Sequence, residues 1–496
     1  MTAPRRAGYI AQLLRDARRS IPLAAFVCAL VATLNAVCWS LITPPFQVPD
    51  EPSHFAYVKQ LAEAHALPSS GSFSFSAEED RAITDLHEGY VQIVPPMGTI
   101  VSLAQERTLE RDLTVAARLP REGSSAAGVA TSQPPFYYLL ETIPYALGWH
   151  GTLLTRLELM RLLSALFAGV TALFVFLFVR EALPGAHAAW APAALSIAFA
   201  PLLGFMSGAV NPDSLLFAIS AAIFWCMARA FRFGLTDRLA ALLGVITVIG
   251  LLTKLNFVGL FPGIMVGVGI LAVRRARLSG RASAYRAFGL AAGIAAAPIA
   301  VVALINLTTD RPALGFVSTS ASLVHGSLLP ALSYTWQLFL PRLPGMRATE
   351  PGIFTTGQIW FDGLVGQYGW LDVAFPEWVY LLAWGFGAAV LVACGRTLVV
   401  LRKTVRARVA EITVYLIISG GLLMLISAAS YFNPSGESYT QARYLLPLLA
   451  LAAALLALAI RAAGRRWEGV LGTVVVLAIF ADDIFSQLLV IARYYG

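Results

Sequence analysis

The stretch IPLAAFVCALVATLNAVCWSLIT, residues 21–43, decides the fold class of this chain of 496 residues. It carries no charged side chain and is long enough to cross a bilayer as an α-helix. Arginines precede it, Pro44 and Pro45 follow it, and no small-residue cleavage site lies between. The run is therefore predicted to be an uncleaved membrane anchor and not a signal peptide.

Similar apolar runs recur along the whole chain, which is 58% hydrophobic and only 13% charged. Backbone polar groups must be satisfied within the segment in lipid, so the runs are expected to be helices. The predicted fold class is an all-α polytopic membrane protein with about 11 transmembrane helices, in a range of roughly 10–13. After the anchor, the predicted spans are 158–179, 188–207, 213–231, 239–253, 255–273, 287–307, 377–401, 411–431, 444–460 and 469–490.

One apolar segment, Gln133 to Trp149, is short and contains Glu141. If it lies on the membrane surface, the arginine-rich loops share one side with the N-terminal arginines, as the positive-inside rule requires. It is therefore predicted to be an interfacial helix, with the N-terminus cytoplasmic in a bacterial inner membrane. On this topology the net charge of +8 reports orientation and gives no reason to expect nucleic acid as a partner.

Two long segments, 44–157 and 308–376, are then expected on the periplasmic side. The resulting division is 1–43 (basic tail and first helix), 44–157 (loop one with juxtamembrane helices), 158–307 (helices 2–7), 308–376 (aromatic-rich loop) and 377–496 (helices 8–11). The acidic run in loop one is predicted to be a solvated face; it comprises Glu78, Glu79, Asp80, Asp85 and Glu88. The aromatic residues of the second loop, Trp370 among them, predict an interfacial belt or a platform for a sugar ring or a prenyl chain.

The most informative motif is Pro49-Asp50-Glu51-Pro52-Ser53-His54-Phe55, shortly after the first span. Asp50 suits the N-cap of a helix that Pro52 would start, and His54 and Tyr57 follow at helical spacing. A cap needs only one acid, so Asp50 or Glu51 is a candidate general base. Desolvation near lipid would raise the pKa of such a carboxyl group toward a useful value.

Three cations are predicted at the outer membrane edge: Lys254, Arg443 and Arg161. Each alone is compatible with a side chain that snorkels to the interface. Together they are candidates to hold a lipid-linked phosphate. Asp213, in Asn211-Pro212-Asp213, is predicted to cap a helix or to bind substrate. The histidines show no zinc-binding spacing.

The order of these motifs resembles the GT-C superfamily of integral-membrane glycosyltransferases that use polyprenyl-phosphate sugars. The resemblance rests on Asp50-Glu51, Gln133-Pro-Pro-Phe-Tyr137-Tyr138, Arg161-Leu-Leu-Ser164 and Asn211-Pro-Asp213. A bacterial branch of predicted membrane proteins is more similar still, through Pro-Asp-Glu-Pro-Ser-His-Phe, Gly369-Trp370-Leu371-Asp372 and Gln441-Ala-Arg443-Tyr444.

The resemblance implies a glycosyltransferase that moves a sugar, with inversion, from a polyprenyl-phosphate donor to a glycan or lipid acceptor of the cell envelope. It implies Asp50 or Glu51 as base and a divalent cation as an optional cofactor, and in that reaction the cations Lys254, Arg443 and Arg161 are expected at the donor phosphate. The substrate-binding candidates are His54, Tyr57, Gln133, Tyr137, Asp213, Gln441 and Trp370. A lipid-linked glycan flippase or other transporter, and a polysaccharide polymerase or ligase, remain alternative hypotheses.

Overall fold

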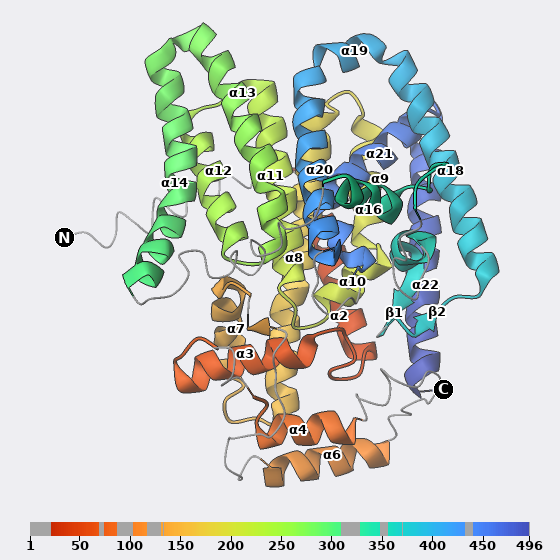
Figure 1. Cartoon of the computed structure of the whole chain (residues 1–496). Helices are drawn as coiled ribbons and strands as arrows, with labels where there is room; N and C mark the ends of the chain where they lie inside the picture. Colours follow the sequence, from red (N-terminus) through yellow and green to blue (C-terminus); the bar gives the residue numbers. More distant parts are fainter. Residues whose placement is uncertain are drawn as a thin grey trace.

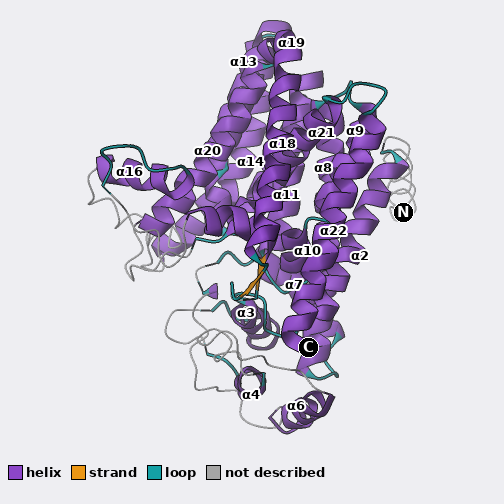
Figure 2. Ribbon diagram, turned by 90° about the vertical axis from the view of Figure 1, so that its right-hand side faces the viewer, coloured by secondary structure: helices purple, strands orange, loops and turns teal. Residues whose placement is uncertain are grey.

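The protein is a bundle of long helices with a layer of short helices across one end (Figures 1 and 2). The computed structural model describes residues 21–68, 74–86, 103–116, 130–131, 133–308, 328–347, 356–369, 371–431 and 440–495. The bundle helices are α2 (Leu23–Ile42), α8 (Leu153–Ala182), α9 (His187–Ala198), α10 (Pro201–Ser207), α11 (Asp213–Phe233), α12 (Asp237–Leu251), α13 (Phe261–Ser279), α14 (Arg281–Thr308), α18 (Glu377–Val400), α20 (Val409–Tyr431), α21 (Leu449–Arg461) and α22 (Glu468–Tyr495). The shorter elements are α3 (Glu51–Ala64), α4 (Ala77–Asp85), α6 (Leu103–Ala116), α7 (Phe136–Leu147), η2 (Leu255–Gly259), α16 (Leu328–Phe339), η3 (Gln358–Asp362), α17 (Gly363–Gly366), α19 (Arg402–Ala407) and η4 (Ala442–Leu448), with strands β1 (Gln367–Tyr368) and β2 (Val373–Ala374).

The prediction of an all-α polytopic membrane protein is confirmed, and a helix lies at each predicted span. Seven helices in the described part of the chain are long and apolar enough to cross a membrane. An eighth span results if α9 and α10, which meet at a 52° bend, cross together. The exact number of eleven is therefore not confirmed. The division of the chain into five parts stays a prediction.

Helix α8 lies at the centre of the bundle and packs against both α2 and α11. A side chain at Gly169 of α8 would place its Cβ 2.2 Å from Thr33 Oγ1 and 2.8 Å from the Ala29 carbonyl oxygen of α2. Small residues let membrane helices approach this closely, and dispersion then replaces the hydrophobic driving force. Gly169 thus fixes the distance between α2 and α8, which carry residues of the site described below.

Basic residues gather at one end of the bundle, as the topology argument expects. Glu181, at the end of α8, accepts hydrogen bonds from Arg229 (3.0 Å) and Arg232 (2.8 Å) of α11. Asp237, at the start of α12, forms ion pairs with Arg275 (2.7 Å) and Arg286 (2.5 Å). These four arginines, all predicted to share one side of the membrane, therefore lie at the same end of the bundle.

The opposite end carries the short helices α3, α4, α6 and α7, drawn in red and orange at the bottom of Figure 1. Helix α7 packs on α3 and α8 as a short surface element, at the place predicted for an interfacial helix. The backbone N–H of Phe136 donates to the Leu252 carbonyl at the end of α12 (2.9 Å). The Gln133-Pro-Pro segment therefore lies beside the α12–η2 turn.

Two aromatic residues of the second outer segment depart from the predicted belt. Trp360 is buried and donates its indole N–H to the Leu338 carbonyl (2.5 Å). Tyr368 is fully buried, and its ring centroid lies 5.0 Å from that of Trp39 in α2. These rings pack inside the protein because their polar atoms have partners there.

Candidate active site

Four charged side chains from distant parts of the sequence meet where α3 joins the bundle. Asp50 precedes α3, Asp213 begins α11, Lys254 lies between α12 and η2, and Arg443 lies in η4. Arg443 Nη2 is 2.5 Å from Asp50 Oδ2, and Lys254 Nζ is 2.7 Å from Asp213 Oδ1. Arg443 Nε is 3.8 Å from Asp213 Oδ2, which joins the two pairs. We call these four residues the charge cluster.

Neither acid of the charge cluster acts as the helix cap that its position predicts. Asp50 occupies the N-cap position of α3 but makes no side-chain cap hydrogen bond. Its φ is 69°, in the left-handed region that aspartate tolerates better than most residues. Non-glycine residues in this region concentrate at functional sites, and here the conformation turns the carboxylate toward Arg443. Asp213 likewise pairs with Lys254, while its backbone N–H donates to Asn211 Oδ1 (3.0 Å).

The position of Lys254 depends on a tight turn between α12 and η2. A side chain at Gly250 would place its Cβ 2.4 Å from the Phe257 ring. Phe257 is fully buried and follows Lys254 by three residues. Gly250 therefore allows η2 to fold back on α12 and present the lysine to Asp213.

The charged groups shift one another's pKa values within a largely buried site. Burial on its own would raise the pKa of Asp50, but Arg443, with a smaller contribution from Lys254, lowers it below its usual range. The expected rise in the pKa of Asp50 is therefore wrong, because a buried guanidinium outweighs desolvation. Burial lowers the pKa of Lys254, against the opposing effect of Asp213.

The charge cluster has unused hydrogen-bonding capacity. Arg443 Nε has no hydrogen-bond partner in the described part of the chain, and neither do the carboxylate oxygens of Asp213, beyond their ion pairs. The side chain of Asp50 is 23% exposed, whereas those of Arg443 and Asp213 are almost fully buried. Buried polar groups usually have partners, so these open positions are suited to a polar ligand.

An aromatic wall borders the charge cluster. Tyr57 of α3 stacks on Tyr138 of α7 with ring centroids 3.8 Å apart and planes 8° from parallel. The Tyr138 hydroxyl lies 2.9 Å from His54 Nδ1, and the Tyr57 hydroxyl donates to the Gln133 carbonyl (3.3 Å). Burial lowers the pKa of His54 to about 3, so this imidazole is neutral at physiological pH.

Gln441 lines a small cavity beside Arg443 and Pro49. The volume of this cavity is about 20 Å³, enough for a single water molecule. Tyr444 places its ring within 6 Å of both cations, with the centroid 5.3 Å from Arg443 Cζ and 5.8 Å from Lys254 Nζ. The predicted residue Gln441 thus lies beside Arg443, and His54, Tyr57 and Gln133 are linked to one another through Tyr138.

Glu51 and Arg161 form a separate buried pair. Arg161 Nε and Nη2 donate to the two Glu51 oxygens at 2.8 and 2.6 Å. The remaining guanidinium donors reach the carbonyl oxygens of Ser40, Thr43 and Pro44, at the end of α2. Glu51 also accepts from the backbone N–H groups of Phe46 (2.9 Å) and Val210 (3.0 Å). Neither side chain has a hydrogen-bonding position left for a ligand.

Tyr137 lies in a third group, behind the aromatic wall. Its hydroxyl is 2.7 Å from Ser164 Oγ, which donates to Glu141 Oε1 (3.0 Å). Burial raises the pKa of Glu141 to about 8, and no cation in the described residues pairs with it. Trp370 lies outside the described residues. Nowhere in the described ranges do three or more His, Cys, Asp or Glu side chains gather closely enough to hold a metal ion.

Three residues of the site were missed or undervalued from the sequence. Tyr138 was not among the predicted substrate-binding residues, yet it is fully buried and contacts His54 and Tyr57. Asn211 orients Asp213, and Tyr444 covers both cations. In the sequence each of the three lies within two residues of a predicted site residue, namely Tyr137, Asp213 and Arg443, and this proximity could have indicated them.

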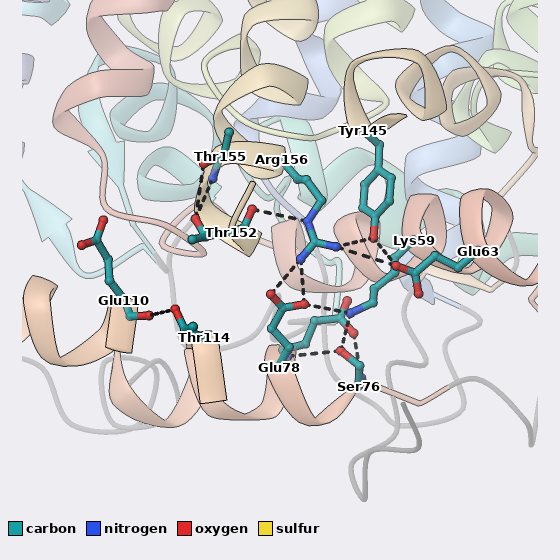
Figure 3. Close-up of polar contacts among 11 residues, drawn as sticks. Lys59, Glu63, Ser76, Glu78, Glu110, Thr114, Tyr145, Thr152, Thr155 and Arg156 are labelled. Carbon is teal, nitrogen blue, oxygen red and sulfur yellow. Dashed lines mark hydrogen bonds and ion pairs between the residues drawn. The ribbon is translucent and has the colours of Figure 1, made fainter. Parts of the chain in front are cut away.

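The prediction of a solvated acidic face in loop one is wrong for Glu78 and Glu79, which are both buried. Arg156 of α8 donates to both oxygens of Glu78, at 2.7 and 2.8 Å, and Lys59 of α3 lies 3.3 Å from the same carboxylate (Figure 3). Glu78 is buried because these two cations reach it from α8 and α3, whereas Glu79 is held by its capping box with Ser76. Asp80 and Asp85 are half-buried, and Glu88 lies outside the described residues.

The fold and the charge cluster define a polytopic helical membrane protein with a polar site at one end of its bundle. The family model described as "Predicted membrane protein (DUF2142)" matches residues 11–452, and the chain belongs to this family. No curated protein matches the chain.

Crystal structures of an oligosaccharyltransferase from Archaeoglobus fulgidus are similar to this chain. The form tethered to an acceptor peptide has 13% identity and a TM-score of 0.42, and the match covers 95% of this chain and 55% of that one. The complex with Zn and sulfate has 12% identity and a TM-score of 0.41, covering 95% and 53%. The apo form has 12% identity and a TM-score of 0.42, covering 95% and 56%. This chain therefore spans about half the length of those structures.

Proposed function

We propose that the protein is a membrane glycosyltransferase that transfers a sugar from a polyprenyl-phosphate donor to a glycan or lipid acceptor of the cell envelope. The observation that carries the proposal is the charge cluster, in which a partly exposed carboxylate is joined to two buried cations at the edge of the helical bundle. Transfer from a sugar phosphate needs a proton acceptor for the attacking hydroxyl and positive charge for the departing phosphate. The charge cluster contains both.

In the proposed reaction, an acceptor hydroxyl oxygen attacks the anomeric carbon of the donor sugar as the bond from that carbon to the phosphate oxygen breaks. Asp50 takes the hydroxyl proton, and the polyprenyl phosphate leaves with the bonding electron pair. One displacement at the anomeric carbon inverts its configuration. Arg443 and Lys254 stabilise the charge that grows on the phosphate.

The pairing of Asp50 with Arg443 gives a reason for donor binding to precede proton transfer. In the free protein Arg443 lowers the pKa of Asp50, which makes it a weak base. A phosphate bound by Arg443 would share its guanidinium and weaken the hold on Asp50. The carboxylate would then become a stronger base only when a donor is in place.

Among the two acids of the Pro-Asp-Glu-Pro motif, we assign the base to Asp50. Glu51 is fully buried, and all of its oxygen positions are occupied by Arg161 and backbone N–H groups. We accordingly assign Arg161 and Glu51 a structural role and restrict the phosphate-binding cations to Arg443 and Lys254. His54, Tyr57, Gln133 and Gln441 are proposed to position the substrates, and Tyr137 to support Tyr138 from behind.

We further propose a bacterial inner membrane with the N-terminus cytoplasmic and the charge cluster on the periplasmic side. The arginines at the far end of the bundle support this orientation, because basic residues favour the cytoplasmic side. The polyprenyl donor would then present its sugar at the outer leaflet, beside α3 and α7.

The test uses purified protein in proteoliposomes with polyprenyl-monophosphate sugars and a membrane-extract acceptor fraction. The expected result is a new glycoside together with free polyprenyl phosphate, one sugar per acceptor. Movement of the donor across the bilayer without a glycosidic product would contradict the proposal and support a flippase. Transfer of long blocks from a lipid diphosphate would support a polymerase or ligase instead.

A further inference from the structure

A second polar pocket lies beside α3, away from the charge cluster. It has a volume of about 350 Å³ and is lined by side chains that include Lys59, Gln60, Glu63, Ser76 and Glu79. This volume falls in the range of about 300–1,000 Å³ that is usual for small-molecule sites. Gln60 lies about 15 Å along the helix from Asp50, at 1.5 Å per residue.

The walls of this pocket are held rigidly by the contacts drawn in Figure 3. Lys59 Nζ donates to Ser76 Oγ (2.7 Å) and Glu78 (3.3 Å), and Arg156 binds both oxygens of Glu78. The hydroxyl of Tyr145 donates to Glu63 (2.7 Å). Helices α3, α4 and α8 are thereby tied together around a site whose side chains are already in place.

Glu79 has an unsatisfied oxygen at this pocket. The residue is 2% exposed; its Oε2 accepts from the Ser76 N–H (2.7 Å) in a capping box, while Oε1 has no hydrogen-bond partner among the described residues. Burial raises the pKa of this carboxyl group. An orphaned buried acceptor carries a free-energy penalty, which a hydrogen-bond donor from a ligand would remove.

The charged and polar side chains that line the pocket determine which class of ligand can bind there. Lys59 would repel a simple cation, while Glu63 and Glu79 would repel an anion. Hydroxyl groups both donate and accept, so they match an arrangement of carboxylate, amide, ammonium and serine side chains. The hydroxyl groups of a neutral polyol can therefore form hydrogen bonds with each kind of side chain that lines the pocket.

We propose that this pocket binds a neutral sugar unit of the acceptor glycan, distant from the hydroxyl that reacts at Asp50. The proposal rests on the glycosyltransferase function proposed above and extends it, because it makes the acceptor an oligosaccharide held at two points along α3. Glu79 would accept a hydrogen bond from a sugar hydroxyl, and Gln60 would bond a neighbouring one.

Binding to an array of neutral, anionic and amine-bearing oligosaccharides, with the full chain in nanodiscs and no donor present, tests the pocket. Glu79→Gln keeps the capping box, since glutamine serves at this position, but can turn the free acceptor into a donor. We expect neutral glycans to bind, and Glu79→Gln and Gln60→Ala each to weaken that binding about tenfold. Glu110→Gln, the same change at an exposed site on α6, should bind as the parent protein does.

Absence of binding to every glycan would overturn the proposal, as would normal binding by both pocket variants when their thermal midpoints match the parent protein. Glu79-dependent binding confined to amine-bearing glycans would also overturn it, in favour of a cationic ligand. If Asp50→Asn retains transfer, the proposed catalytic function fails, while the pocket is still judged by glycan binding to Glu79→Gln and Gln60→Ala alone.

Discussion

Two adjacent acids, Asp50 and Glu51, each pair with a buried arginine, and the two pairs differ in what remains open. Glu51 and Arg161 form hydrogen bonds with each other and with five backbone groups, which fill all of their hydrogen-bonding positions. Asp50 and Arg443 form a single short contact at 2.5 Å, the Asp50 side chain is 23% exposed, and Arg443 Nε has no hydrogen-bond partner in the described residues.

The difference separates a structural pair from one suited to chemistry. A saturated buried pair holds its elements together, here the end of α2, the start of α3, α8 and the segment before α11. An unsaturated pair can exchange one of its contacts for a contact with a ligand. Both pairs join a carboxylate to a guanidinium, so the exposure of the acid and the open hydrogen-bonding positions distinguish them.

The largest expected effect is on stability, at the saturated pair. Arg161→Ala leaves Glu51 charged and buried and removes a donor from each of three carbonyl groups, so the free energy of unfolding should fall by about 3–5 kcal/mol. Thermal unfolding in nanodiscs and the yield of folded protein measure this. Glu51→Leu combined with Arg161→Met, which removes both charges, should recover part of the loss. An Arg161→Ala variant as stable as the parent would show that the pair is not structural.

A second prediction concerns activity at the unsaturated pair. Arg443→Lys keeps the charge but loses the planar guanidinium that spans Asp50, Asp213 and a phosphate, so transfer should fall about a hundredfold. The thermal midpoint should change less than in Arg161→Ala. Arg493→Lys is the matched control, because Arg493 pairs with Asp372 (2.9 Å) outside the charge cluster. Equal transfer rates for the two lysine variants would remove Arg443 from the donor site.

How far the sequence predicts these features differs between fold and site. Apolar runs locate the helices, because bilayer thickness sets their length and the positions of charges set their ends. Asp50, Asp213, Lys254 and Arg443 could be nominated because charges at a membrane edge need partners. The sequence does not predict which arginine pairs with which acid. The pairing depends on the left-handed backbone at Asp50 and on packing between helices hundreds of residues apart.

The burial of Glu78 and Glu79 shows the same limit. A run of acids is usually solvated, and nothing local indicates that Lys59 and Arg156 reach Glu78 from other helices. One local signal was present, since Ser76 and Glu79 have the spacing of a capping box, which fixes the start of α4 and the direction of Glu79.

A further prediction tests a buried acid that belongs to neither pair, through the change in stability per pH unit. Glu141 has a pKa raised by burial to about 8, against a usual value of 4.5. The folded protein therefore holds this proton more tightly than the unfolded chain. The contribution of Glu141 to stability should be fully present below about pH 4.5 and fall as the pH rises toward 8, by at most about 1.4 kcal/mol per pH unit.

Thermal midpoints between pH 5 and pH 8 measure this dependence. Glu141→Gln should flatten it, because the amide carries no titrating proton and can keep the hydrogen bond to Ser164 Oγ. Glu158→Gln, at an exposed position on α8, should leave it as in the parent protein. A slope that survives in Glu141→Gln would assign the pH dependence to another group.

The transfer rate of Asp50→Asn, measured beside Glu51→Gln with a polyprenyl-monophosphate sugar, tests the central claim most directly. Asparagine can accept the Arg443 hydrogen bond but not a proton, so we predict a folded protein whose transfer is slower by about 10²–10⁴-fold. Glu51→Gln should unfold at a lower temperature, yet its folded fraction should transfer sugar at a rate close to the parent protein's. Full transfer activity in Asp50→Asn, together with inactivity of correctly folded Glu51→Gln, would contradict the assignment of the base to Asp50.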